Sequence, residues 1–344
     1  MKLGTWQFAG LFTLAILGAN HVSGAEWMRY FTYYGSWGTI GLVLTILLIT
    51  YLSSKLVRLI HFLQIRSVSE LFQLIFGPVV SPVLTFLFYC ITIGFSAFVL
   101  QDQVQQLFSL AGIAPVISLL VFLGILLFAV TISIQNVSKA ALVGVILAII
   151  YVLLFFIKQP HIQLPSFAYQ FNLWWGVRAL FFTSSHLLLS LVILIPAVAR
   201  MSDVRLAARG VWIGGSFFAL LALLSHFVLL AFWHDVNATT HPFYVLSANL
   251  FLSGFSLFLV ISALLCLLYI AIWSEGLAHL VAMRFDINQR PLQILLLASI
   301  AGISFIYALS FWFGLFTYLS AVYFGLFFLL FLIRHIWRAA KKNK

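Results

Sequence analysis

The sequence predicts an all-α integral membrane protein with about ten transmembrane helices. Hydrophobic residues make up 64% of the 344 residues and charged residues only 7%, whereas charged residues are roughly 25% of a soluble globular protein. Apolar runs of about 20 residues, long enough to cross a bilayer as helices, recur along the whole chain. Basic residues gather in alternate loops, as orientation in a bilayer favours.

The predicted spans follow one another through short loops and form a single transmembrane domain over 1–344. Its two halves are 5–158 and 173–338. Span boundaries lie at roughly 5–33 (interrupted), 36–58, 81–107, 114–135, 137–157, 173–200 (interrupted), 207–233, 254–283, 291–311 and 314–336. The loop from Ile60 to Phe76 predicts a short amphipathic helix at the interface. The loop from Asn237 to Ser247 is expected to cover the outer face.

The charge distribution predicts the orientation. With ten spans and a cytoplasmic N-terminus, fifteen of the 18 Lys and Arg fall on the cytoplasmic side, and Arg29, Lys158 and Arg178 remain outside. This asymmetry predicts a multi-pass protein of the bacterial cytoplasmic (inner) membrane with both termini in the cytoplasm. It also accounts for the net charge of +11 without a nucleic-acid partner. Membrane lipids and a small solute are the expected partners, and the oligomeric state stays open.

The first span has a second interpretation. Lys2, the apolar run from Phe8 to Leu17 and the residues Val22-Ser23-Gly24 before Ala25 would also serve as a secretory signal with a cleavage site. Its removal would leave nine spans with unchanged loop orientation. Both alternatives remain open at this point.

A polar, glycine-containing interruption divides the first span between Gly18 and Glu26. Non-helical backbone persists at membrane depth only where protein or a water-filled cavity surrounds it, because hydrocarbon cannot bond to free N–H and C=O groups. The interruption therefore predicts a solute site. The candidate binding residues are Gly18, Ala19, Asn20, His21, Ser23 and Gly24.

A second interruption is predicted in the sixth span, at Phe182 to His186. It lies five spans after the first, and since five is odd, the second half enters the membrane inverted. Broken helices at matching positions of inverted halves are typical of the central site of secondary transporters. The candidate binding residues here are Thr183, Ser184, Ser185 and His186, although a histidine packed between helices is the ordinary alternative.

Four further residues are candidates for coupling or gating: Glu26, Arg178, Asp102 and Ser262. Glu26 follows the break and could carry a proton, or it could be a helix-start acid that pairs with Arg29. Arg178 needs a counter-charge, and Glu26 or Asp102 would form an outer gate with it. Asp102 alone is also compatible with an interfacial cap.

Two further histidines have both a functional and a structural interpretation or a structural one alone. Glu275 and His279 lie on one helix face and suit either a proton relay or a solvated interface. His226 in the seventh span is expected to be a buried hydrogen-bonding residue.

The first interruption carries a family resemblance. Its matches to the run Gly-Ala-Gly-Phe-Ala-Ser-Gly-x-Glu, followed by an aromatic residue and a glycine, are Gly18, Ala19, Ser23, Gly24, Glu26, Phe31 and Gly35. The chain resembles the YkvI-type family of bacterial membrane proteins, within the amino acid, polyamine and organocation (APC) superfamily of LeuT-like fold. Asn20 and His21 depart from the pattern where a ligand would be held. Weaker similarity extends around Phe181 to Pro196.

The resemblance implies a LeuT-like 5+5 inverted repeat with broken helices 1 and 6. Spans one, two, six and seven would form a bundle that rocks against spans three, four, eight and nine. The half-helix that begins near Ser23 would present N–H groups to a carboxylate. Carbonyl groups at the end of the half-helix from Trp174 to Phe182 would suit an amine.

The predicted function is secondary active transport of a small, amino-acid-like solute by alternating access, coupled to a proton or sodium gradient. The alternative is a non-transporting receptor or sensor subunit on the same fold, to which spore germinant receptor subunits offer a parallel. Sodium would call for oxygen ligands, and Cys266 and Leu267 follow Ser262 where another hydroxyl would help, which favours protons. No cofactor, metal site or enzymatic activity is expected, because no catalytic motif occurs in the sequence. Cys90 and Cys266 lie in apolar runs and predict no disulfide.

Overall fold

The computed structural model describes residues 3–18, 23–158, 172–250, 254–309 and 311–342, and within these ranges every regular element is a helix. Among these described residues, eight helical runs are long and apolar enough to cross a membrane, and two shorter apolar helices accompany them. Together they match the ten predicted spans in order, so the all-α membrane fold is confirmed.

The first span consists of α1 (Thr5–Leu17) and α2 (Ala25–Tyr30), and a short 3-10 turn (Thr32–Tyr34) connects it to α3 (Gly35–Phe62). The other spans are α5 (Ser81–Ala111), α6 (Pro115–Ala129), α7 (Ile134–Lys158), α8 (Trp174–Ala199), α9 (Val204–Ala231), α12 (Gly254–Phe285), α13 (Gln289–Leu309) and α14 (Phe311–Lys342).

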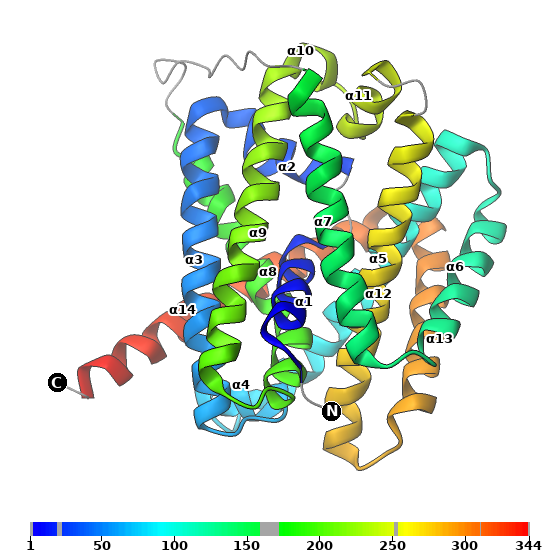
Figure 1. Ribbon diagram of the computed structural model, residues 1–344. Coiled ribbons are helices and arrows are strands. Elements are labelled where there is room, and N and C mark those ends of the chain that lie inside the picture. Colours follow the sequence, from blue (N-terminus) through cyan, green and yellow to red (C-terminus); the bar gives the residue numbers. More distant parts are fainter. Residues whose placement is uncertain (1–2, 19–22, 159–171, 251–253, 310, 343–344) are drawn as a thin grey trace.

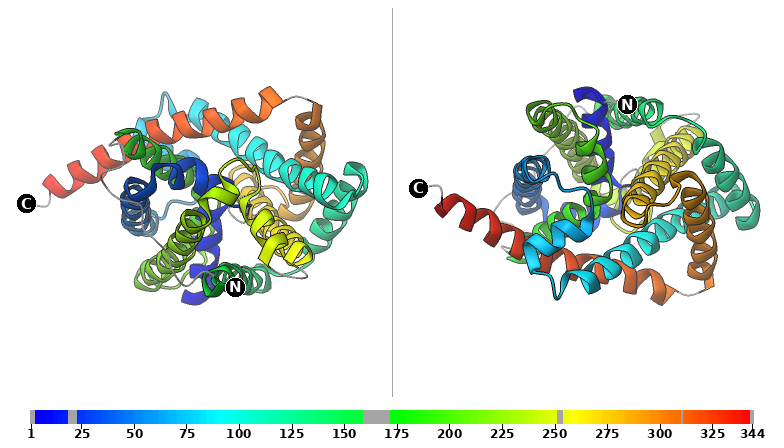
Figure 2. Two further views of the ribbon diagram at one scale, coloured as in Figure 1. Left: turned by 90° about the horizontal axis from the view of Figure 1, so that it is seen from above. Right: turned by 90° about the horizontal axis from the view of Figure 1, so that it is seen from below.

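The spans pack in two groups, which lie side by side in both end-on views of Figure 2. One group contains α1, α3, α8 and α9, and the other contains α5, α6, α12 and α13. These are spans one, two, six and seven and spans three, four, eight and nine, the grouping that the family resemblance implies. Helix α7 packs against α1, α9 and α12, while α14 packs along α8 and α5.

Helix α1 is part of the core. Its residues 8–17 are all buried, and it packs against α9, α7 and α8. A Cβ atom placed on Gly10 would lie 2.9 Å from the backbone of Leu142, so small side chains allow this close packing. The first segment is thus packed inside the helix bundle in this structure.

Shorter helices cover the two ends of the bundle (Figure 1). At one end, α4 (Val68–Phe76) is capped by Ser67, whose Oγ accepts a hydrogen bond from the backbone N–H of Glu70 at 3.2 Å. This confirms a helix in the loop predicted to be amphipathic. At the other end are α10 (Trp233–Val236) and α11 (Pro242–Leu250), within the loop expected to cover the outer face.

The predicted break in the sixth span is wrong, because α8 is helical throughout Trp174–Ala199. Its polar groups bond to the helix's own backbone instead. Ser184 Oγ donates to the Phe181 carbonyl at 3.0 Å, Ser185 Oγ donates to the same carbonyl at 2.8 Å, and His186 Nδ1 lies 2.9 Å from the Phe182 carbonyl. Such back-bonding satisfies serine and histidine without unwinding the helix. Because α8 does not end at Phe182, it presents no helix-terminal carbonyl groups there to an amine.

Candidate functional site

The break in the first span is bounded by two glycines. Gly18 caps α1 with φ of 64°, and Gly24 precedes α2 with φ of 84°. A side chain at Gly24 would be strained in this left-handed conformation and would also meet the ring of Phe243 at 2.9 Å. Ser23 Oγ accepts a hydrogen bond from the Ala25 N–H at 3.2 Å. The predicted site residues Ala19, Asn20 and His21 lie outside the described residues.

Helix α2 has aromatic side chains on one face and the charged side chain of Glu26 on the other. Trp27, Tyr30 and Phe31 pack on Phe182 of α8, with ring centroids 6.0, 5.2 and 5.3 Å apart. Burial of these rings anchors α2 to the bundle. Glu26 lies on the other face, where it lines a cavity.

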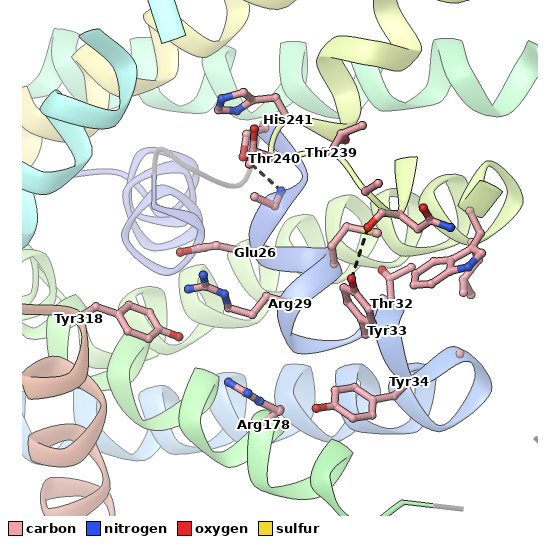
Figure 3. A pocket seen from close by; sticks show the side chains of 18 of the residues that line it. Glu26, Arg29, Thr32, Tyr33, Tyr34, Arg178, Thr239, Thr240, His241 and Tyr318 are labelled. Atoms are coloured by element: carbon pink, nitrogen blue, oxygen red, sulfur yellow. Dashed lines mark hydrogen bonds between the residues drawn. The ribbon is translucent and has the colours of Figure 1, made fainter. Parts of the chain in front are cut away.

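A cavity of about 1540 Å³ lies between α2 and the segment that contains α10 and leads into α11 (Figure 3). Its rim includes the exposed residues Tyr33, His234, Ala238 and Thr240, so the cavity reaches the surface near α10 and α11. Its deeper lining includes Ser23 and Met28, which are 3% and 5% exposed. The cavity thus connects one face of the protein with the helix break.

The cavity contains four of the residues singled out from the sequence: Ser23, Glu26, Asp102 and Arg178. The predicted outer gate is not closed in this arrangement, because within the described ranges Glu26 approaches His186 rather than Arg178, and the Arg–carboxylate ion pair is Arg200–Glu275. Asp102 instead accepts a hydrogen bond from Gln106 at 3.0 Å.

The other predicted residues that the structure describes lie outside the cavity lining. Thr183, Ser184, Ser185 and His186 are buried in α8, and Gly18 and Gly24 border the break. Ser262 receives a hydrogen bond from Gln103 at 3.2 Å and donates to the Leu259 carbonyl at 3.2 Å.

His186 lies beneath the cavity and approaches Glu26, with Nε2 and Oε2 4.0 Å apart. The imidazole stacks on Phe182 at a centroid distance of 3.9 Å. Because the Phe182 carbonyl accepts only, Nδ1 carries the hydrogen in its 2.9 Å contact. In the neutral ring Nε2 is then an acceptor, and it faces a carboxylate. A proton bound to either group would join two acceptors that otherwise repel.

Several lining residues were missed by the sequence reasoning. Arg29 was considered only as a partner for Glu26, but its guanidinium lies 5.6 Å from the ring centroid of Tyr318. Tyr34 and Tyr318 enter the cavity from the two neighbouring elements, the 3-10 turn and α14. The position of Arg29, three residues after Glu26 and on the same helix face, was a signal from which its place in the cavity could have been predicted.

The opposite end of the bundle is held together by an ion pair. Arg200 Nη2 lies 2.6 Å from Glu275 Oε1, and Nη1 lies 3.2 Å from Oε2. The two side chains are only 18% and 16% exposed. Gln289 donates a further bond to Glu275 Oε1 at 3.0 Å. The solvated interface considered for Glu275 is therefore replaced by a largely buried contact between the two helix groups.

His226 behaves as predicted. Its Nδ1 lies 3.1 Å from Thr32 Oγ1 and its Nε2 lies 2.8 Å from Thr39 Oγ1. The histidine thereby ties α9 to the 3-10 turn between α2 and α3 and to the beginning of α3. This is a structural role that holds the cavity wall in place.

Comparisons with known proteins agree with this geometry. No protein-family model matches the chain. The chain is 21% identical over 234 residues to the uncharacterized membrane protein YkvI of Bacillus subtilis, an alignment that covers 67% of each chain. This relative is a membrane protein, and the structural neighbours below are transporters.

Two solved structures share the arrangement of helices. A Na+-coupled sialic acid symporter in an outward-open state aligns with a TM-score of 0.66 at 15% identity, over 95% of this chain and 78% of its own. A manganese transporter of Eremococcus coleocola aligns with a TM-score of 0.62 at 13% identity, over 97% and 76%. The chain is therefore a multi-pass membrane protein of LeuT-like fold, similar in sequence to YkvI.

Proposed function

We propose that the protein is a secondary active transporter that moves a small, amino-acid-like solute by alternating access. The observation that carries this proposal is the asymmetry between the two ends of the bundle. A cavity open at one end reaches the helix break and Glu26, while at the other end Arg200 and Glu275 join the two helix groups. A reversal of this asymmetry would deliver a bound solute across the membrane.

The Glu26–His186 contact supports coupling to protons. The pair lies at the cavity floor, where one proton would convert a repulsive contact into an attractive one. For sodium, Ser262 would have to give up its hydrogen bond from Gln103. We therefore propose proton coupling, with Glu26 as the group that gains and loses the proton.

The same proposal includes a location and an orientation. The cavity opens on the side of α10 and α11, which the basic residues assign to the outside of a bacterial inner membrane. Both termini are then cytoplasmic, and the halves 5–158 and 173–338 form the inverted repeat.

Counterflow is the deciding experiment. Purified full-length protein is reconstituted into liposomes loaded with one unlabelled amino acid at a time, and entry of the same labelled amino acid is followed. We expect transient accumulation for at least one amino acid. Binding without any counterflow would contradict transport and favour a sensor subunit.

Topology is tested with reporter fusions. We expect a fusion after Lys344 to report a cytoplasmic location and an insertion between Ala238 and Thr239 to report the outside, because most basic residues lie on the side of the termini. A C-terminal reporter on the outer side would contradict the ten-span orientation.

Water access to the break gives another prediction. In a variant without Cys90 and Cys266, Ser23→Cys should react with a small aqueous thiol reagent added outside, since Ser23 lines the cavity. Ser185→Cys should stay inert, since Ser185 is buried in α8 and bonded to its backbone. Equal reactivity of the two cysteines would contradict the described cavity floor.

A further inference from the structure

The outer cavity contains two guanidinium groups on different helices. Arg29 comes from α2 and Arg178 from α8, and Figure 3 shows both side chains directed into the same space as Glu26 and Tyr318. Asp102 of α5 also lines this space. Burial lowers the pKa of His241 at the rim, so this histidine stays neutral at neutral pH. Guanidinium groups stay protonated in proteins, so the two arginines, and not His241, supply positive charge to this space.

Neither arginine is neutralised by a carboxylate within the described part of the chain. Arg29 lies over the ring of Tyr318, which leaves most of its N–H groups available. Nε of Arg178 is buried and, among the described residues, has no hydrogen-bond partner. A buried donor without an acceptor is unfavourable. An acceptor brought by a ligand would remove this cost.

A carboxylate suits this pair of arginines. The planar guanidinium group donates two parallel hydrogen bonds to the two oxygens of a carboxylate, which a lysine cannot do. The N-terminus of α2 is a poorer site than the sequence suggested, because α2 has only six residues and its dipole is correspondingly small. A dianionic phosphate would be repelled by Glu26 and Asp102.

The carboxylates occupy the same cavity as the arginines. Asp102 lies near enough to Glu26 for the two charges to interact, and it accepts a hydrogen bond from Gln106. An amine placed beside Asp102 would relieve the repulsion between the two acids. The cavity thus offers a positive and a negative subsite of balanced formal charge.

We propose that the solute is a small zwitterion, with its carboxylate bound by Arg178 and Arg29 and its amine bound beside Asp102. This inference rests on the proposed function and names the substrate class of the same site. Arg178 is the specificity-determining residue, because its unpartnered Nε is the donor that the ligand satisfies.

Thermal unfolding of the purified full-length protein tests the inference, because a ligand of the folded state raises its apparent stability. The probes are alanine, leucine, phenylalanine, glutamate and lysine. Each active amino acid is compared with its amide, which lacks the carboxylate, and with its desamino acid, which lacks the amine. We expect stabilisation by at least one amino acid and at least about tenfold weaker binding of both analogues.

Variants assign the carboxylate subsite. Arg178→Gln should weaken binding of the amino acid about tenfold or more and abolish its preference over the amide, while Arg178→Lys should be intermediate because it keeps the charge and loses the planar fork. The matched control is Arg205→Gln, which removes an exposed arginine at the start of α9 and should leave binding unchanged. Unfolding without ligand shows whether each variant is folded.

Separate outcomes distinguish the two proposals. Failure of every amino acid to stabilise the wild type overturns the zwitterion, as does equal binding of the amide and the amino acid. Counterflow of an uncharged solute that Arg178→Gln does not affect would overturn the zwitterion and leave transport standing. Binding that depends on Arg178 without any counterflow would support the zwitterion and contradict transport.

Discussion

Replacement of Glu26 by glutamine should abolish accumulation of the solute against its gradient while exchange at equal concentrations persists. The variant keeps the shape of the side chain and fixes its neutral form, so the cavity floor can no longer gain and lose a proton. In proteoliposomes, a gradient of one pH unit drives at most about tenfold accumulation when one proton accompanies each solute. For Glu26→Gln we expect the inside and outside concentrations to become equal.

This expectation follows from the contact between Glu26 and His186. With Nδ1 donating to the Phe182 carbonyl, the neutral imidazole turns its acceptor toward the carboxylate at 4.0 Å. Binding of a proton from the cavity changes the sign of this interaction, and the change acts between α2 and α8 at the floor of the site. In the proposed cycle, this change links proton binding to helix position.

A matched variant and a partner variant sharpen the measurement. Asp286→Asn removes an exposed acid beyond α12 and should accumulate solute like the wild type. His186→Gln should shift the pH dependence of exchange, because a side chain that cannot be protonated replaces the imidazole beside Glu26. Wild-type accumulation by Glu26→Gln, with unchanged pH dependence, would assign Glu26 to the ordinary role of an acid at a helix start.

The break in the first span could be predicted from the sequence, because glycines adopt the backbone conformations at its two ends. Gly18 and Gly24 have positive φ values of 64° and 84°, which other residues rarely adopt. Polar residues and two glycines in an apolar run leave few alternatives at membrane depth. The acid that follows them, Glu26, was singled out for the same reason, and it lines the cavity.

The continuous α8 could not be predicted in the same way. A run of serine, threonine and histidine is compatible with an unwound backbone or with hydrogen bonds to the preceding turn. The outcome depends on packing: Gly325 of α14 allows close contact with the backbone of Ser184 and Ser185, which favours the helix. Such contacts join segments far apart in the sequence.

The meeting of the two arginines in the cavity could not be predicted from the sequence either. Arg29 and Arg178 belong to helices separated by five spans, and their convergence depends on how α2 packs on Phe182. The same is true of Arg200 and Glu275, whose charges are 75 positions apart. The sequence supplies the charged groups, and the tertiary packing decides which of them meet.

Loss of the Arg200–Glu275 pair should open the end of the bundle opposite the cavity. Glu275→Gln leaves the largely buried Arg200 without its carboxylate, and a charge-assisted hydrogen bond contributes about 1.5–3 kcal/mol. If that contact exists only while this end is closed, the equilibrium shifts toward the open form by roughly tenfold to a hundredfold. Solute affinity measured from the outer side should fall accordingly.

Cysteine reactivity measures this shift. Val192 of α8 is buried, and its side chain lies 3.2 Å from the Cβ position of Gly276, beside Glu275. In a background without Cys90 and Cys266, Val192→Cys should be protected. Addition of Glu275→Gln should raise its reactivity about tenfold or more and lower that of Ser23→Cys in the outer cavity. Equal changes at both positions would indicate loosening of the whole protein.

The exchanged pair Arg200→Glu with Glu275→Arg separates closure from general stability. If the attraction between the two side chains holds this end closed, the exchange restores protection of Val192→Cys, whereas either single change does not. Gln289 donates to Glu275 in the native pair and still has an amide oxygen that can accept from an arginine at 275. Failure of the exchange to restore protection, in a variant with wild-type unfolding temperature, would show that the ion pair does not control access to this end.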